Sequence, residues 1–209
     1  MRNPKKTWDA NLQNIKNMHW LHEQLVSIVP AMDLSDLLRS EHVLIVSAFD
    51  CYIHDVVLSG MAEMFNESKK ECKDFTDFCI PMSTVKLLLA TQDPSIREEI
   101  YNASVKKILS KDSYQSPKSV EFALGLINLR KVWKNIGDYI GKPTEEIKRK
   151  LGIIIQRRNK IAHEADIDNF VSMEKTSIDR SDVYDVFSFL DRIVNVIEHL
   201  RTLETQMKI

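Results

Sequence analysis

The feature that most constrains this chain is a strongly apolar stretch in its first third, residues 43–61. The stretch reads VLIVSAFDCYIHDVVLSGM, and its apolar side chains would cover nearly the whole circumference of a helix. A helix of that kind is usually buried on several sides. We therefore predict that a helix running to about Phe65, capped by Asp33 or Ser35, lies at the centre of a helical bundle.

Helical signals recur along the rest of the chain. A proline suits the first turn of a helix, and apolar side chains that repeat every three to four residues mark its buried face. These signals predict helices over about residues 4–28, 81–90 and 117–139, one that opens at Asp93-Pro94, one that runs from about 143 into the segment 157–166, and a last one capped by Ser181. Residues 66–80 are expected to form a loop or short helix, 110–119 a polar linker, and 166–179 an irregular segment.

The composition favours long helices over sheets. Only 5 Gly and 6 Pro occur in 209 residues, whereas β proteins use these residues in many turns. Apolar residues make up 44% of the chain, enough for a substantial core, and the length suits one domain better than two. We therefore predict an all-α fold, a bundle of about five to seven helices that forms a single helical domain over residues 1–209.

Several observations bear on compartment and partners. Cys51, Cys72 and Cys79 are too few for a disulfide framework, and no apolar stretch follows the basic N-terminus as in a secretory signal. The longest uncharged apolar run, residues 42–49, is too short to span a bilayer. We expect a soluble cytoplasmic protein that uses no membrane. A net charge of −1 argues against coating nucleic acid by bulk electrostatics, but leaves room for a local basic site.

One short segment offers side chains that suit chemistry on a phosphodiester. Residues 156–164, QRRNKIAHE, contain a fixed cation, an amide and an imidazole. Cleavage of RNA by its own 2′-hydroxyl needs a base, an acid and a cation that stabilises the phosphorane. His163 suits the proton transfers because imidazole titrates near neutrality. Arg158 suits the phosphorane because its planar guanidinium binds two oxygens and stays charged.

The spacing within this segment complicates that interpretation. A helix turns about 100° per residue, so Asn159 and His163 share a face whereas Arg158 and His163 diverge by about 140°. The guanidinium and the imidazole can therefore meet only if the helix ends or loosens between them, or if a second copy supplies part of the site. The second option predicts a symmetric dimer with both segments facing one cleft.

The neighbourhood of the segment is basic. Residues 142–160 contain seven Lys or Arg against two acids, Glu145 and Glu146. On a nearly neutral protein this cluster is where an anionic backbone would dock. We predict that Arg157 and Lys160 bind the RNA backbone.

At these residues the chain resembles the HEPN superfamily, and specifically its RiboL-PSP-HEPN branch. HEPN domains are helical bundles marked by an Arg, four to six residues and a His, with a polar residue directly after the Arg. Here the pattern is Arg158, Asn159 and His163, with four residues between the Arg and the His. The segment LRSEHVLIVSAFDCYIHDVV, residues 38–57, is similar to the N-terminal core helix of that branch.

The resemblance implies a metal-independent endoribonuclease, a homodimer with paired motifs at its interface, and a role in prokaryotic defence or a toxin–antitoxin system. Carried to this sequence, it makes Arg158 and His163 catalytic and Asn159 supportive. Asp50 becomes a polar residue of the core helix that orients the Arg. No cofactor is implied, and an antitoxin or regulatory protein is a possible partner.

Two alternatives stand beside the ribonuclease. The chain could be a non-catalytic dimerising helical module that binds RNA or a partner protein, as many HEPN domains are. It could also be a metal-dependent hydrolase, since Asp50 and His54 lie four residues apart on one helix face. No third ligand has a recognisable spacing, so we expect no metal and favour a buried hydrogen-bonded pair.

Overall fold

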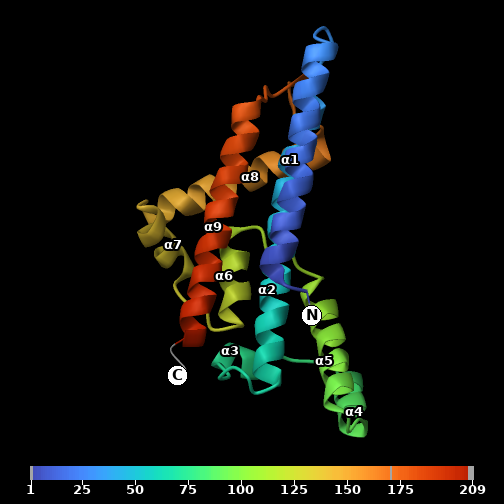
Figure 1. Cartoon of the computed structure of the whole chain (residues 1–209), viewed down its shortest axis with the longest axis vertical. Coiled ribbons are helices and arrows are strands. Elements are labelled where there is room, and N and C mark those ends of the chain that lie inside the picture. The colour runs from blue at the N-terminus through green and yellow to red at the C-terminus, as the bar shows by residue number, and fades with distance from the viewer. Residues whose placement is uncertain (1, 170, 207–209) are drawn as a thin grey trace.

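The computed structural model describes residues 2–169 and 171–206, with side chains up to Leu203, and within these ranges most residues are helical. The expected all-α fold is therefore confirmed, and Figure 1 shows the elements as an elongated bundle. The helices are α1 (Pro4–Ile28), α2 (Ser35–Phe65), α3 (Lys73–Thr76), α4 (Met82–Ala90), α5 (Pro94–Leu109), α6 (Pro117–Gly125), α7 (Val132–Ile140), α8 (Thr144–Glu164) and α9 (Arg180–Gln206), and the strands are β1 (Ile167–Asn169) and β2 (Glu174–Lys175).

Helix α2 lies at the centre of the bundle, as its sequence predicts. It contacts α1, α5, α6, α8 and α9, and its side chains from Ile45 to Met64 supply much of the core. Its length and composition would allow it to cross a membrane, but half of its most apolar window is buried against the rest of the protein. That burial is typical of the core helix of a bundle.

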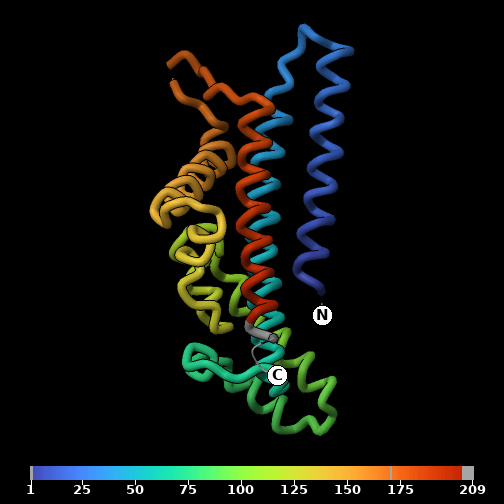
Figure 2. Tube along the Cα trace, turned by 60° about the vertical axis from the view of Figure 1, so that its left-hand side comes forward, coloured from blue at the N-terminus to red at the C-terminus, as the bar shows by residue number. Residues whose placement is uncertain are grey.

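Helices α1 and α9 flank α2 along most of its length (Figure 2). The indole Nε1 of Trp8 on α1 donates a 2.9 Å hydrogen bond to Asp191 Oδ1 on α9, which joins the two flanking helices. Helix α1 begins at Pro4, as predicted, with Asn3 capping the backbone N–H of Lys6. At the start of α2, Asp33 accepts a hydrogen bond from the backbone N–H of Ser35, which is itself the first helical residue.

The single helix predicted over 117–139 is wrong, because the chain turns sharply between α6 and α7. Asn128 and Lys131 adopt left-handed backbone angles, with φ of 67° and 53°. The turn lets Leu126, Ile127 and Leu129 all enter the core, whereas a straight helix would carry at least one of them to the solvent side. Packing of these three side chains thus overrides the local helical preference.

Three smaller expectations also change. The segment 166–179, predicted to be irregular, contains the antiparallel hairpin β1–β2. The last helix begins at Arg180, and its first turn is capped by Asp179, whose Oδ1 accepts from the backbone N–H of Asp182, rather than by Ser181. Nine helices occur in the described part of the chain instead of five to seven, since α3 is separate and α6 and α7 are split.

Candidate functional site

The motif segment lies on α8, which is an unbroken helix from Thr144 to Glu164. Ile147, Leu151 and Ile154 hold it against the core. The helix ends directly after the motif, where Ala165 and Asp166 adopt positive φ angles of 51° and 61° and both donate backbone hydrogen bonds to the carbonyl of Lys160. It therefore neither ends nor loosens between the predicted catalytic residues, which removes one of the two ways in which they could converge.

Arg158 continues the buried stripe of α8, because it follows Ile154 by four residues and Leu151 by seven. Its side chain is half-buried, and its Nε is buried without a hydrogen-bond partner among the described residues. Its Nη1 donates a 3.0 Å hydrogen bond to Oδ1 of Asn159. The guanidinium is thus turned out of the core stripe and toward the face that Asn159 occupies.

Asn159 and His163 are both exposed and lie four residues apart, on one face of α8. Arg158 is bonded to Asn159, so its guanidinium lies beside the amide, and the exposed imidazole follows one turn later on the face of Asn159. No hydrogen bond or ion pair engages the His163 side chain within residues 2–169 and 171–206, so its ring is available for proton transfer.

Arg157 has a different environment from its neighbour. Its Nη2 lies 2.8 Å from Oδ2 of Asp166 and also donates to the carbonyl oxygens of Thr176 and Ser177. Arg39 on α2 reaches the same Asp166 oxygen through Nε at 2.8 Å, and its Nη2 donates to the Thr176 carbonyl. Asp166 is completely buried, so two guanidiniums from two helices neutralise one enclosed carboxylate.

Lys160 is also engaged within the chain. Its Nζ lies 2.9 Å from Oδ1 of Asp168 and 3.1 Å from Oγ1 of Thr176. The ammonium group holds the pKa of the Asp168 carboxyl below its usual value. The two cations predicted to bind RNA, Arg157 and Lys160, therefore already have acidic partners on the segment that follows α8. Their role in RNA binding stays a prediction.

Asp50 on α2 makes its side-chain contacts with residues outside the motif segment. Its Oδ1 accepts a 2.6 Å hydrogen bond from the backbone N–H of Tyr114 and lies 3.8 Å from Nε2 of His54. In the described part of the chain, no hydrogen bond or ion pair links Asp50 to Arg158. The predicted orientation of Arg158 by Asp50 gains no support from these contacts and stays a prediction.

Three residues that hold the motif helix were missed from the sequence: Arg39, Asp166 and His42. His42 is buried, and its Nε2 lies 3.0 Å from the carbonyl oxygen of Ile154, which ties α2 to α8. Burial lowers the pKa of His42, so the neutral ring with Nε2–H as the donor is favoured. The sequence did show His42 as a polar residue on the otherwise apolar helix α2. It did not show that its hydrogen-bond partner would be a carbonyl of α8.

Within residues 2–169 and 171–206, no three His, Cys, Asp or Glu side chains come together in a group that could hold a metal ion. A cavity of about 470 Å³ opens between α8 and α9, and Arg149, Lys150 and Arg157 line it together with Asp182 and Asp185. Arg149 is exposed and makes no ion pair with a described residue. The basic character predicted for this stretch is therefore partly offset by acids of α9.

The comparisons with known proteins agree with this helical architecture. The family model RiboL-PSP-HEPN matches residues 16–200, which include the central helix α2, the motif helix α8 and most of α9. No curated protein and no solved structure matches the chain. Since the family model covers well over half of the sequence, the chain belongs to the RiboL-PSP-HEPN family.

Proposed function

We propose that this protein is a metal-independent endoribonuclease of HEPN type. The observation that carries the proposal is the hydrogen bond from Arg158 to Asn159, because it turns the guanidinium toward the face that Asn159 shares with His163. A guanidinium and an imidazole near the end of one helix suit a phosphodiester with a neighbouring hydroxyl once a second copy brings the two groups together. Membership of a family in which such domains are often ribonucleases adds independent support.

The proposed reaction balances without a metal or an added reactant. An imidazole takes the proton of the 2′-hydroxyl, and the 2′ oxygen forms a bond to the phosphorus. The bond from phosphorus to the 5′ oxygen breaks, and that oxygen takes a proton from an imidazolium. The products are a 2′,3′-cyclic phosphate and a 5′-hydroxyl. Arg158 binds the equatorial oxygens of the phosphorane. A positioned acid, base or cation typically raises the rate of such a reaction by about 10²–10⁴-fold.

We infer that two copies build the reacting cleft. One imidazole can take the 2′ proton and then, as imidazolium, protonate the 5′ oxygen, so the cleft needs at least one His163 beside one Arg158. Arg158 and His163 of a single chain diverge by about 140° on an unbroken helix, so a second copy has to supply one of them. Two copies related by a two-fold axis, with their α8 ends facing, would bring two guanidiniums and two imidazoles to one phosphodiester.

RNA docking in this proposal uses the basic side of α8. Arg149 is exposed and makes no ion pair with the described residues, so its charge is available to a phosphate. Arg157 and Lys160 can add to the field of the site while they hold the segment that follows α8. Phosphate contacts of this kind position the strand without selecting its sequence.

The setting that we propose is a cytoplasmic toxin or defence nuclease of a prokaryote, restrained by an antitoxin or another regulatory protein. A nuclease that acts on cellular RNA would halt growth unless it is restrained. Expression of the wild-type chain should therefore arrest growth, and the His163→Ala variant should not. Equal growth of both strains at equal protein level would speak against this setting.

The activity test compares cleavage of a mixed RNA substrate with and without EDTA. We expect cleavage that persists in EDTA and disappears in Arg158→Ala and His163→Ala. Matched controls are Arg97→Ala and His199→Ala, which replace exposed residues of α5 and α9 and should keep full activity. Cleavage abolished by EDTA would indicate a metal-dependent hydrolase, and RNA binding without cleavage would indicate a non-catalytic module.

A further inference from the structure

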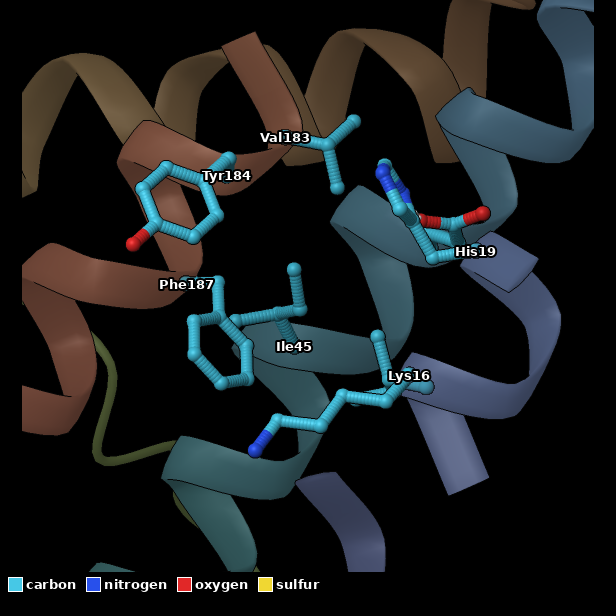
Figure 3. A pocket seen from close by; sticks show the side chains of 8 residues that line it. Lys16, His19, Ile45, Val183, Tyr184 and Phe187 are labelled. Carbon is cyan, nitrogen blue, oxygen red and sulfur yellow. Dashed lines mark hydrogen bonds and ion pairs between the residues drawn. The ribbon is translucent and has the colours of Figure 1, made fainter. Parts of the chain in front are cut away.

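A second cavity lies away from the motif helix, between α1, α2 and α9. It has a volume of about 220 Å³, and Figure 3 shows Tyr184 and Phe187 on one side of it with Lys16 and His19 on the other. Its apolar lining includes Ile45, which is completely buried, and Val183, which is 2% exposed. The two aromatic rings on α9 are stacked, with centroids 6.3 Å apart and planes 20° from parallel.

One edge of this cavity is polar. Glu41 on α2 lines it and is completely buried, with Oε2 2.8 Å from Nδ1 of His19. Arg180 donates from Nε to the other ring nitrogen of His19 at 3.2 Å. An arginine is only a donor, so Nε2 of His19 is the acceptor and the proton is on Nδ1. In this hydrogen-bond geometry the Nδ1–H of His19 donates to Glu41.

The second carboxylate oxygen of Glu41 has no partner. Its Oε1 is buried and accepts no hydrogen bond from the described residues. A buried acceptor without a donor has lost its hydrogen bonds to water and gained none in return, which destabilises the folded state. A ligand that enters this cavity with an N–H group could supply the missing donor.

The volume of the cavity and the charges around it restrict the class of ligand that can bind there. A cavity of about 150 Å³ holds benzene, so about 220 Å³ suits a slightly larger ring system. The charged groups around it balance, since Lys16 and Arg180 face Glu23 and Glu41, with Arg180 paired to Glu23. The Lys16 ammonium lies 5.3 Å from the centroid of the Phe187 ring, which places a cation at the rim. A neutral ligand fits this balance better than a charged one.

We propose that this cavity is a binding site for a neutral, flat, fused-ring heterocycle whose N–H donates to Oε1 of Glu41. The ring would lie on Ile45 and Val183 and contact the rings of Tyr184 and Phe187. Tyr184 is 67% exposed, so it can cover the ligand and gain burial as it does so. The proposal assigns the cavity a binding role that is independent of the ribonuclease.

Indole and indene form a matched pair of probes, because they share a shape and differ in the N–H group. Calorimetry is done near pH 8, because burial raises the pKa of Glu41 and an alkaline pH favours its ionised carboxyl. We expect indole to bind about five- to tenfold more tightly than indene, because only indole can donate a hydrogen bond to Glu41. Equal affinities, or no binding of indole, would overturn the proposal.

Variants locate the binding site. Tyr184→Ala should weaken indole binding several-fold, and Glu41→Gln should reduce the difference between indole and indene. Tyr139→Ala is the matched control, since Tyr139 on α7 is also 67% exposed and lies outside the cavity. Circular dichroism checks that each variant is folded. Unchanged indole affinity in folded Tyr184→Ala and Glu41→Gln would refute this site.

A free heterocycle and a base within an RNA strand share this chemistry. The affinities of adenine and of ApA, the dinucleotide in which one phosphodiester joins two adenosines, separate the two sources. Tighter binding of the dinucleotide, lost in Lys16→Ala, identifies a nucleic-acid ligand whose phosphate meets the rim cation. Equal or weaker binding of the dinucleotide identifies a free heterocycle.

Discussion

The guanidinium of Arg39 and the carboxylate of Asp166 form a buried ion pair across 127 positions of sequence, with Nε and Oδ2 2.8 Å apart. The pair joins the central helix α2 to the second residue after the end of α8. Arg157 approaches the same oxygen from α8. The end of the motif helix is therefore held in place by charges that are enclosed within the protein.

The first prediction concerns this ion pair. Arg39→Met should lower the free energy of unfolding by about 3–5 kcal/mol, because it leaves the buried Asp166 with only one of its two cations. Urea unfolding followed by circular dichroism measures the change. Lys142→Met is the control, since the Lys142–Glu146 pair is exposed at the start of α8 and should contribute about 0–1 kcal/mol. Equal effects of the two substitutions would show that the buried network does not stabilise the fold.

The second prediction concerns the turn that ends α8. Ala165 has a φ of 51°, in the left-handed region where glycine is favoured. Ala165→Gly should therefore raise the free energy of unfolding by about 0.5–1 kcal/mol. Ala162→Gly, at an exposed position inside the same helix, should lower it by about 1 kcal/mol. Thermal unfolding of both variants tests the opposite signs, and destabilisation by both would contradict this account of the turn.

The boundaries of α1 and α2 could be predicted because prolines, polar caps and apolar periodicity act locally. The position of the motif on a helix followed in the same way. The break between α6 and α7 could not be predicted, since it depends on Ile127 reaching the space beside Gly60, where an added Cβ would lie 2.7 Å from the Ile127 side chain. The pairing of Arg39 with Asp166 was equally hidden, because nothing in one sequence relates positions so far apart.

The third prediction concerns pH. Burial lowers the pKa of His42, so the unfolded chain binds this proton more readily than the folded chain does. Stability should therefore fall as the pH drops below about 6.5, with a slope of up to about 1.4 kcal/mol per pH unit for this group. Urea unfolding at about pH 7.5 and 5.5 should show a smaller difference for His42→Gln than for the wild type. Burial lowers the pKa of His22 too, so part of the difference should remain. An unchanged pH dependence in His42→Gln would refute the role of His42.

The most direct test of the shared cleft mixes two inactive variants. Arg158→Ala and His163→Ala should each fail to cleave RNA. In an equal mixture that exchanges subunits, about half of the dimers carry one chain of each kind, and their cleft retains one guanidinium and one imidazole. The account predicts that cleavage reappears in the mixture. A mixture that stays inactive, although differently tagged chains are shown to pair, would contradict the claim that two copies build one site.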